Sequence, residues 1–492
     1  MKRLRYILTL LCTAAVAFSC NDWLTVRPST VIEAEKLLAT DDGIRQALNG
    51  AYLRLRNTCY GPASQRMGSG GLVERLAASY YSTNTTTDLY YWSNHMYGES
   101  PGMDNTNNDF MITLYNVVAN LNTLINGMEK HEDRLDTRTY SLVRGEALAL
   151  RALVHFDLMR VYGPVPAAPD ASVAYLPYVT DNHYMAYTYE TYDRFMELMF
   201  MDMDEAERLL KEYDPVITMS WDETEIENYT WHYRKSRLNY YGVLGLQARM
   251  HLWMGGDTHK SEALRYANLV KDAMEPDGAT PKFRLTVAAD IESGAQYSDD
   301  RYYYFEHLAG VLCDNFDYLN DGDIIWKSGS LTSNHPTFAT LMVNGNTSDL
   351  RYKVGVESTY ISTPRPGRYV YAMKKGKSFH AASNASKNFP IIRFAEIYFI
   401  LMELNSLSEA NILYQEYCDT RDITYVPMTD ETRAETLLHE SIREFFGEGQ
   451  NFFTYKRNRV RNIWFTDNEC SDEMYRVPIP TAELLSTDLT IE

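Results

Sequence analysis

An aromatic and amide-rich stretch at Asn84–His95 contains the side chains best suited to recognising a ligand. Rings and short polar groups lie next to one another there without a helical or a two-residue period, and the residues of interest are Tyr90, Tyr91, Trp92 and Asn94. An aromatic ring offers a flat apolar face, whereas amides and carboxylates exchange hydrogen bonds with hydroxyls. A sugar has an apolar C–H face and a rim of hydroxyls, so this mixture favours a glycan site. Any single aromatic here could instead fasten the loop to the scaffold.

A second aromatic cluster lies at Tyr302–Phe305, and Trp326 follows it in the same long segment. From this cluster we select Tyr303 and Trp326 as further candidate ligand-binding residues. The chain has 38 Tyr against 18 Phe and 7 Trp. Tyr combines an apolar face with a polar tip, so its excess suggests wet binding surfaces in addition to ordinary packing.

Catalytic and metal-binding patterns are missing from the sequence. It has no HExxH, GxSxG, Walker or GxGxxG motif, and its 11 His are dispersed. Asp317–Asp323 (DYLNDGD) superficially resembles a calcium loop, but Leu319 and Ser328 occupy positions three and twelve, where calcium ligands are needed. We therefore predict no catalytic residue, no metal and no cofactor. A carboxylate pair of a glycosidase could still form in space from the 66 Asp and Glu, although nothing in the sequence identifies one.

The formal net charge of −19 argues against nucleic acid as a partner, because phosphate binding needs a basic face. One basic stretch departs from this background, between Arg365 and Lys387. It could receive an anionic sugar or an acidic loop of a partner, but a solvated hairpin face is the simpler interpretation.

The first twenty residues predict export and a lipid anchor. Lys2, Arg3 and Arg5 precede a mostly apolar run, Tyr6–Phe18, that is shorter than the roughly 20 residues a membrane-spanning helix needs. Small residues then lead to Cys20, as in a bacterial lipobox, so we expect residues 1–19 to be removed and Cys20 to be acylated. An ordinary signal peptide with a chance cysteine is the alternative.

Four further cysteines are widely spaced along the exported part of the chain: Cys59, Cys313, Cys418 and Cys470. An oxidising compartment would permit disulfides, but no short spacing suggests a disulfide framework or a zinc site. We favour buried free thiols.

Amphipathic helices must position these groups, because apolar residues recur at helical spacing over long segments. The predicted helices span residues 41–57, 109–128, 137–162, 189–211, 236–254, 260–273, 394–407 and 430–446. Loop-rich stretches separate them at residues 60–108, 164–188, 215–235 and 276–388. Loops this long are uncommon unless they are functional, and loops on a rigid scaffold often carry binding sites.

The helices at 236–254 and 260–273 form a hairpin through Gly255–Asp257 that looks like a tetratricopeptide-type repeat. Small residues, including Gly242 and Ala263, are expected where the paired helices approach. The predicted fold is mainly α, a scaffold of such hairpins with long, partly β insertions that form a ligand-binding face. We expect residues 20–492 to be one domain, with halves at 20–235 and 236–492.

Several blocks, in order along nearly the whole chain, resemble the SusD/RagB family of nutrient-uptake lipoproteins of Bacteroidetes. The matching blocks are Asn21–Leu24, Asn49–Tyr52 (NGAY), Tyr115–Asn120, Gly145–Pro166, Arg237–Asn239 with Ala248–Arg249, Pro390–Tyr398, Glu448–Phe453 and Val477–Pro480. The most specific is Gly145–Pro166, which is similar to the family pattern GEAxxLRAxxYFxLxxxYGxVP. Departures occur at Asn405, Gln450 and Phe453, where the family usually has Ala, Arg and Asp.

The resemblance implies an outer-membrane lipoprotein at the cell surface, anchored through Cys20 and seated on a SusC-like TonB-dependent transporter. Such a protein captures oligosaccharides or polysaccharides and delivers them to the transporter without catalysis. The loops that would bind match nothing specific, so neither the glycan nor its linkage and charge follows from the sequence. The alternative is a peptide- or protein-binding lid or scaffold of the same transporter system, which uses the groove of the repeat hairpin.

Overall fold

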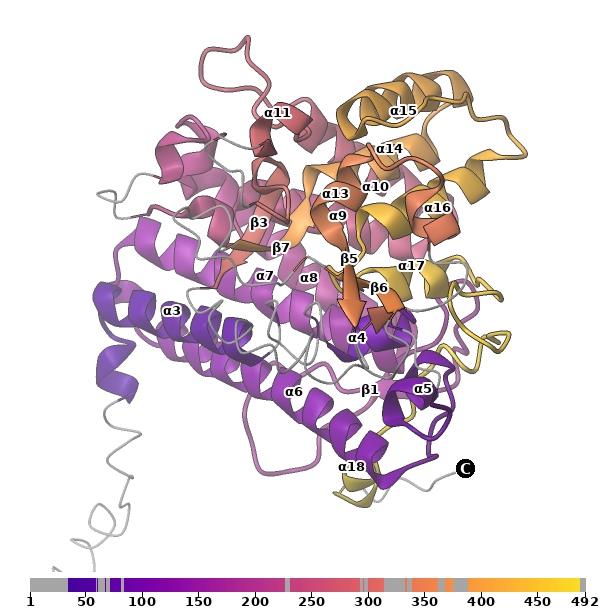
Figure 1. Cartoon of the computed structure of the whole chain (residues 1–492). Helices are drawn as coiled ribbons and strands as arrows, with labels where there is room; N and C mark the ends of the chain where they lie inside the picture. Colours follow the sequence, from indigo (N-terminus) through magenta and orange to yellow (C-terminus); the bar gives the residue numbers. More distant parts are fainter. Residues whose placement is uncertain are drawn as a thin grey trace, which may run out of the picture.

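The computed structural model describes residues 34–58, 60, 67, 71–80, 84–225, 231–292, 295, 300–313, 332–333, 339–361, 368–373, 375 and 388–486. Long helices dominate these residues, and the strands are few and short (Figure 1). The predicted mainly α fold is confirmed. Cys20 and Trp326 lie outside the described residues.

Four long helices build the N-terminal half: α3 (Asp41–Thr58), α6 (Pro101–Glu129), α7 (Thr137–Tyr162) and α8 (Tyr192–Tyr213). Helix α7 is the central one, because nearly every side chain along it is buried and it packs against α3, α6 and α8. Its limits agree with the prediction. Asp136 caps its first turn by accepting a hydrogen bond from the Thr139 N–H at 2.9 Å.

Helix α6 begins eight residues before the predicted start. The side chain of Ser100 accepts a hydrogen bond from the Met103 N–H, and Pro101 occupies the first helical position. Both are standard N-terminal signals, so the helix begins at the cap rather than at the first regular apolar residue.

The predicted hairpin is formed by α9 (Tyr240–Met254) and α10 (Gly256–Lys271), which pack side by side. Gly255, with φ +67°, permits the sharp reversal between them. The predicted use of Gly242 is wrong, however. A Cβ at Gly242 would lie 2.7 Å from Ala309 Cβ, so this glycine admits a strand rather than the partner helix.

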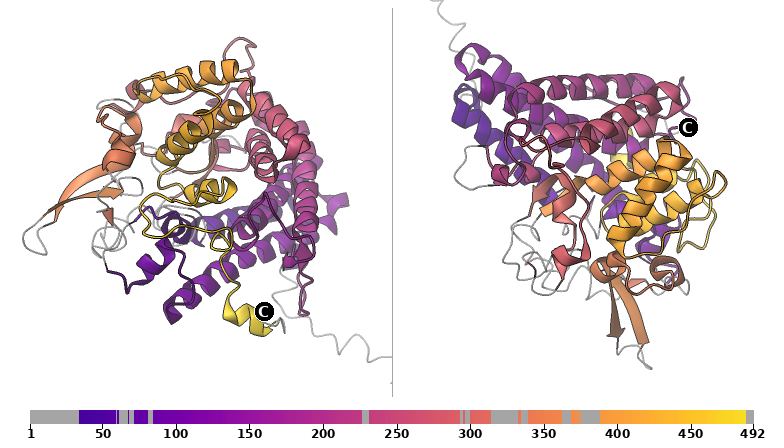
Figure 2. Two further views of the ribbon diagram at one scale, coloured as in Figure 1. Left: turned by 90° about the vertical axis from the view of Figure 1, so that its right-hand side faces the viewer. Right: turned by 90° about the horizontal axis from the view of Figure 1, so that it is seen from above.

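Five helices form the C-terminal part: α14 (Phe394–Leu404), α15 (Leu407–Arg421), α16 (Arg433–Glu444), α17 (Asn451–Arg457) and α18 (Thr481–Ser486). Helix α14 packs against the α9–α10 hairpin, and Figure 2 shows the orange helices near these pink ones, whereas α18 lies against α6. Helix α15 is an addition to the prediction, which ended the preceding helix at Leu407 and continued without one.

The shorter helices connect these elements. The α-helices are α4 (Leu72–Leu76), α5 (Asp88–Ser93), α11 (Ala288–Ile291) and α13 (Leu350–Gly355). Single turns of 3₁₀-helix are η1 (Glu132–Arg134), η2 (Pro215–Ile217), η3 (Glu223–Glu225), η4 (Arg234–Ser236) and η5 (Tyr304–Glu306), and η6 (Ala339–Val343) is a π-turn.

Three small antiparallel sheets complete the described fold. Strand β1 (Ala174–Leu176) pairs with β2 (Glu190–Thr191), and β3 (His307–Leu312) pairs with β7 (Asn388–Arg393). The third sheet has the order β4-β6-β5, from β4 (Thr332–Ser333), β6 (Arg368–Met373) and β5 (Val356–Ile361). The β3–β7 pair is buried along nearly its whole length and lies against α9.

One continuous hydrophobic core extends from α3 to the turn after α17, through both halves of the chain. Cys313, Cys418 and Cys470 are buried free thiols in it, as predicted, whereas Cys59 lies outside the described residues. Among the helices that the structure describes, none is long and apolar enough to cross a membrane.

Lys375 corrects the interpretation of the basic stretch as a solvated face. Its side chain is buried, and its ammonium group donates to Glu448 and to the Glu444 carbonyl. A buried cation needs paired acceptors, and this one has them. Most other basic residues of the stretch lie outside the described residues.

Candidate ligand-binding site

The first aromatic cluster forms a short helix, α5, where the sequence suggested an irregular loop. The side chain of Thr87 accepts a hydrogen bond from the Tyr90 N–H at 3.3 Å and caps the helix. Asp88 in the first turn accepts a hydrogen bond from the Ser100 hydroxyl, which ties α5 to the start of α6. Six residues are too few to show a hydrophobic period, so the cap was the only available signal.

Trp92 and Asn94, two of the candidate ligand-binding residues, are buried in this structure. Trp92 is only 1% exposed and packs at 5.9 Å from the Tyr97 ring. The Asn94 amide donates to the Tyr90 carbonyl at 3.0 Å and accepts from the Asp467 N–H at 2.8 Å. Both residues fasten the segment to its surroundings in this structure. Their role in ligand binding stays a prediction, because no described contact supports it.

Tyr90 and Tyr91 keep part of their surfaces exposed. Their ring centroids lie 6.3 Å apart with the planes at 73°, so the two rings present different faces to solvent. The residues before them, Asn84–Thr86, are exposed and rich in hydroxyl and amide groups. The described residues of this segment thus bring together partly open aromatic rings and small polar groups, the combination that favours a sugar.

Tyr303 is fully buried and does not join α5 in a common platform. It has a left-handed backbone, with φ +57°, and its ring lies 4.9 Å from the Arg393 guanidinium and 4.7 Å from that of Arg421. A ring between two guanidinium groups is a cation–π contact inside the protein. The residue therefore stabilises a buried charge cluster in this structure, and its role in ligand binding stays a prediction.

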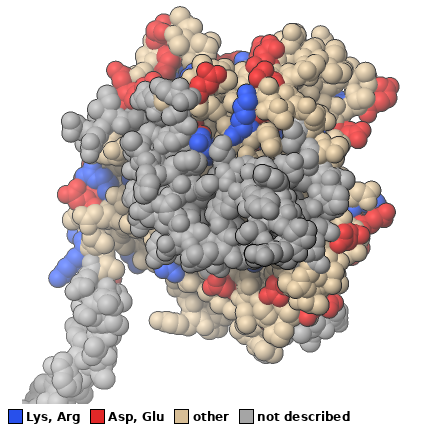
Figure 3. Space-filling model, in the orientation of Figure 1, with Lys and Arg blue, Asp and Glu red and all other residues tan. Residues whose placement is uncertain are grey.

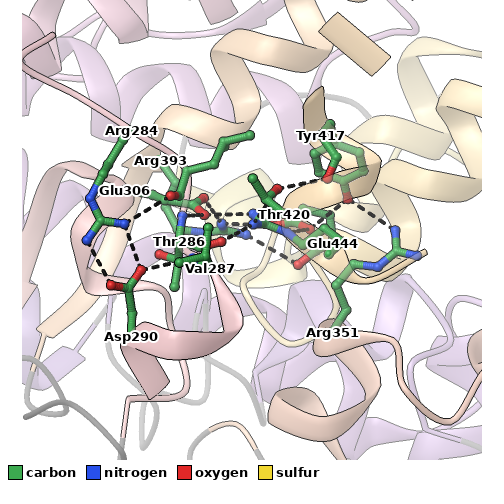
Figure 4. A network of polar contacts seen from close by, with 12 residues as sticks. Arg284, Thr286, Val287, Asp290, Glu306, Arg351, Arg393, Tyr417, Thr420 and Glu444 are labelled. Carbon is green, nitrogen blue, oxygen red and sulfur yellow. Dashed lines mark hydrogen bonds and ion pairs between the residues drawn. The ribbon is translucent and has the colours of Figure 1, made fainter. Parts of the chain in front are cut away.

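That cluster joins η5, β7, α15 and α16 (Figure 4). Arg393 donates to Glu306 at 2.7 Å and to Glu444 at 2.9 Å, and Arg421 donates to the same two carboxylates at 2.7 and 2.8 Å. The Tyr417 hydroxyl donates to Glu444 at 2.7 Å. Although burial opposes ionisation, Arg421 and Arg393 hold the pKa of Glu444 well below its usual range.

The turn after α16 links this cluster to α4. Glu448 accepts hydrogen bonds from Arg393, and the Gly449 N–H donates to Glu74 at 2.6 Å. Gly449 has φ +71°, and a Cβ there would lie 2.2 Å from the Met67 carbonyl oxygen. Burial raises the pKa of Glu74 to about 7.

Other residues of the matching sequence blocks also form buried polar pairs. The Tyr52 hydroxyl donates to Glu146 at 2.8 Å, and Arg234 lies between Glu146 and Asp214. Arg249 forms a two-point pair with Glu396 at 2.7 and 2.6 Å. Sequence reasoning identified these blocks but not their function, which in this structure is to fasten helices to one another.

No group of three or more His, Cys, Asp or Glu among the described residues could hold a metal ion. The acidic turn at Asp317–Asp323 lies outside that part of the chain. On the face shown in Figure 3, acidic and basic side chains are interspersed, and no continuous basic surface is seen among the described residues.

Residues 48–219 match a family model of SusD-like proteins whose description is "Starch-binding associating with outer membrane". The fold as a whole is similar to solved structures of SusD superfamily proteins. The family model covers part of α3 and all of α5, α6, α7 and α8, and the candidate site lies on α5.

Three crystal structures illustrate the similarity of the fold. A SusD superfamily protein from Bacteroides thetaiotaomicron is 18% identical, with a TM-score of 0.66 over 92% of this chain and 98% of that one. One from Bacteroides vulgatus is also 18% identical, with a TM-score of 0.64 over the same shares of the two chains. A "SusD-like carbohydrate binding protein" from B. vulgatus is 16% identical, with a TM-score of 0.62 over 92% and 97%.

At these identities the comparison establishes the fold and carries no binding residue across. No curated protein matches the chain significantly.

Proposed function

We propose that this protein is a cell-surface lipoprotein that binds oligosaccharide or polysaccharide and delivers it to a SusC-like TonB-dependent transporter. The proposal rests on the residues that α5 exposes. Tyr90 and Tyr91 are partly exposed there, directly after the hydroxyl-rich Asn84–Thr87, on a segment fastened to long helices. The starch-binding description of the matching family model supports a glycan as the ligand.

The proposed mechanism is binding and release without bond cleavage. A preformed platform costs little conformational entropy when the ligand arrives, so aromatic stacking and hydroxyl contacts contribute directly to affinity. Three fully buried carboxylates of the described part, Glu146, Glu306 and Glu444, are each paired with arginines. Carboxylates paired in this way are poor acid–base catalysts, so none of these three suits the role of a glycosidase acid or nucleophile.

Calorimetry with an oligosaccharide pool tests the site. The double variant Tyr90→Ala/Tyr91→Ala should lose roughly 1–3 kcal/mol of binding free energy for each stacked ring. Tyr184→Ala is the matched control, since Tyr184 is a fully exposed tyrosine on a different loop. Unchanged affinity in the double variant, with the control also unchanged, would remove α5 from the binding site.

The lipid anchor is tested separately. Cys20→Ser should release the protein from the membrane fraction, because several acyl chains hold far more tightly than electrostatics could hold an acidic protein. Intact cells carrying the unaltered protein should lose it to added protease. Protection in intact cells, with digestion only after lysis, would contradict a location on the cell surface.

A second candidate function, as a lid or scaffold that binds a peptide or protein, is favoured by the loop between β1 and α8. Tyr184 and Met185 at its tip are 109% and 77% exposed. The loop is well braced, since Asn182 donates to the Ala119 carbonyl of α6 at 2.8 Å and the His183 and Tyr187 rings stack at 4.2 Å. A rigid loop that presents large apolar side chains to solvent is typical of a protein contact. Tyr184→Ser/Met185→Ser should then weaken peptide or transporter binding and leave glycan binding unchanged.

A further inference from the structure

Two histidines meet across the turn of the α9–α10 hairpin. His251 near the end of α9 and His259 near the start of α10 are both partly buried, and their Nδ1 atoms lie 2.7 Å apart. The ring centroids are 5.0 Å apart, so the two nitrogens point almost directly at one another. A metal ion between them would need about 4 Å, since each bond from zinc to a histidine nitrogen is about 2 Å long. The contact is therefore a hydrogen bond between the two rings.

Aromatic stacking holds both rings of this histidine pair in place. The His251 ring stacks with Phe200 of α8 at 4.4 Å and with Tyr266 of α10 at 5.6 Å. The His259 ring stacks with the same Phe200 at 5.7 Å. Side chains of three helices thus fix the geometry in which the two Nδ1 atoms face each other.

The turn beside the pair has few other constraints. Gly255 and Gly256 have φ +67° and +70°, and a Cβ at either position would meet no heavy atom within 4 Å. No side chain caps the start of α10, and the buried residues of this helix begin only at Ala263. Among the side-chain hydrogen bonds that the structure describes, the one from His259 to His251 joins the first two turns of α10 to α9. The two glycines form a hinge, and the histidine pair closes it.

The carboxylates of α8 beside the pair are engaged by other groups. Asp204 accepts a hydrogen bond from the Gln247 amide at 3.0 Å, and Glu207 accepts one from the Tyr266 hydroxyl at 2.9 Å. Neither of these described contacts includes a histidine nitrogen, so the nitrogens that face each other are bonded only to one another.

Burial and the charged groups of α10 keep the pair neutral at pH 7. Burial, together with the neighbouring His259, lowers the pKa of His251 to about 4, and burial also lowers the pKa of His259. Glu262 opposes both shifts, and Arg265, which lies 2.7 Å from Glu262, adds to the shift of His251.

The hydrogen bond limits the number of protons that the pair can hold. In the neutral pair one Nδ1 carries a proton and donates it, and the other Nδ1 is bare and accepts. A first added proton enters at the Nε2 of the donor ring and leaves this bond intact. A second added proton places a hydrogen on both Nδ1 atoms, so that two cations face each other donor to donor. Such a pair must separate, because like charges at this distance repel.

We propose that His251 and His259 form a pH-sensitive contact that holds the start of α10 against α9 at neutral pH and releases it in acid, with Gly255 and Gly256 as the hinge. The buried side chains from Ala263 onward keep the rest of α10 in place, so the release is local. The folded-state pKa values lie below the ordinary value of about 6.5, so the contact stabilises α10 above pH 6.5 and is lost as the pH falls toward 4. This inference is independent of the proposed glycan site.

Hydrogen exchange of the mature protein tests the inference, with rates expressed as protection factors to remove the intrinsic effect of pH. Protection of the amides of residues 260–262 should fall by about tenfold or more between pH 7 and pH 4, because the released histidines take up protons. The amides of residues 411–413 are the matched control, since they lie at the start of α15, which Ser406 caps. Unchanged protection at 260–262, or an equal loss in both segments, would overturn the inference.

A variant of the pair tests the part that the histidines play. His259→Phe keeps a ring against Phe200 but has no nitrogen, so protection at 260–262 should already be low at pH 7 and should change little at pH 4. His183→Phe makes the same substitution at an exposed histidine outside the hairpin and should retain the full response. If His259→Phe does not fold, His251→Phe takes its place. A fall in protection as large as that of the unaltered protein, in a folded variant of the pair, would overturn the inference.

Discussion

Trp92 illustrates how residue type and residue position differ as guides to function. Its ring and its amide-rich neighbours suggested a stacking surface, but the ring is buried against Tyr97 in the core. Tyr90 and Tyr91, two and one positions earlier, keep exposed surface because they lie on the other side of α5. The residue types of the site could be read from the sequence. Which of the rings faces solvent depends on a six-residue helix that periodicity cannot reveal.

The burial of Trp92 predicts a loss of stability. Trp92→Ala should lower the free energy of unfolding by about 3–5 kcal/mol, the usual effect of removing a buried aromatic side chain. Urea denaturation followed by circular dichroism measures it. Tyr184→Ala, at a fully exposed ring, should change stability little. An equally small effect in Trp92→Ala would show that its ring is not packed in the core.

His155 gives the fold a dependence on pH. Its Nε2 accepts a hydrogen bond from the Val179 N–H at 3.0 Å, which requires a neutral ring, and burial lowers its pKa to about 3. Since the folded-state pKa lies below the ordinary value of about 6.5, its contribution to stability is present above pH 6.5 and is lost as the pH falls toward 3.

The variant His155→Gln should flatten the decrease in melting temperature between pH 7 and pH 4. Thermal melts at several pH values measure the difference between the two proteins. His183→Gln, which changes an exposed histidine, is the control and should leave the slope as it is. Parallel slopes for His155→Gln and the unaltered protein would contradict a neutral buried ring.

At the scale of elements, the long helices with a regular apolar stripe could be predicted, and α7 was predicted to the residue. The start of α6 and the existence of α15 do not follow from apolar periodicity, because caps rather than a regular apolar stripe mark them. The signals were present. Ser100–Pro101 precedes α6, and Ser406 with Glu409 forms a capping box at the start of α15. The β3–β7 sheet pairs strands about 80 residues apart, and local sequence carries no information about such a pairing.

The capping box of α15 can be tested directly. The Ser406 hydroxyl accepts from the Glu409 N–H at 3.3 Å, so Ser406→Ala should lower stability by about 1 kcal/mol. Chemical denaturation measures the change. Ser408→Ala is a matched control at an exposed position two residues later. Equal effects of the two substitutions would show that the cap does not stabilise the helix.

At the scale of the whole molecule, a buried charge cluster joins segments that are distant in the sequence. Arg421 of α15 donates to Glu306 before β3, to Glu444 of α16 and to the Thr286 carbonyl at 2.9 Å. The resemblance predicted the blocks around Arg393 and Glu448 but not their convergence, because the partners come from four separate elements. Gln450 and Phe453, where the sequence departs from the family pattern, both contact the buried Arg160.

Breaking this cluster should destabilise the entire chain. Arg421→Met leaves Glu306 and Glu444 each short of a buried partner, and such a loss costs about 3–5 kcal/mol. Arg208→Met removes an exposed pair with Glu205 and should cost at most about 1 kcal/mol. Denaturant unfolding compares the two variants. Similar small losses in both would contradict the view that the buried cluster holds the C-terminal helices to the strand layer.

The most direct measurement of the central claim is the binding of the mature protein to a glycan array and, in parallel, to a peptide library. We predict binding to a set of related oligosaccharides that falls when Tyr90 and Tyr91 are both replaced by alanine, with no peptide bound at comparable affinity. Binding to peptides alone, with no oligosaccharide retained, would contradict the assignment of this protein as a glycan-capturing receptor.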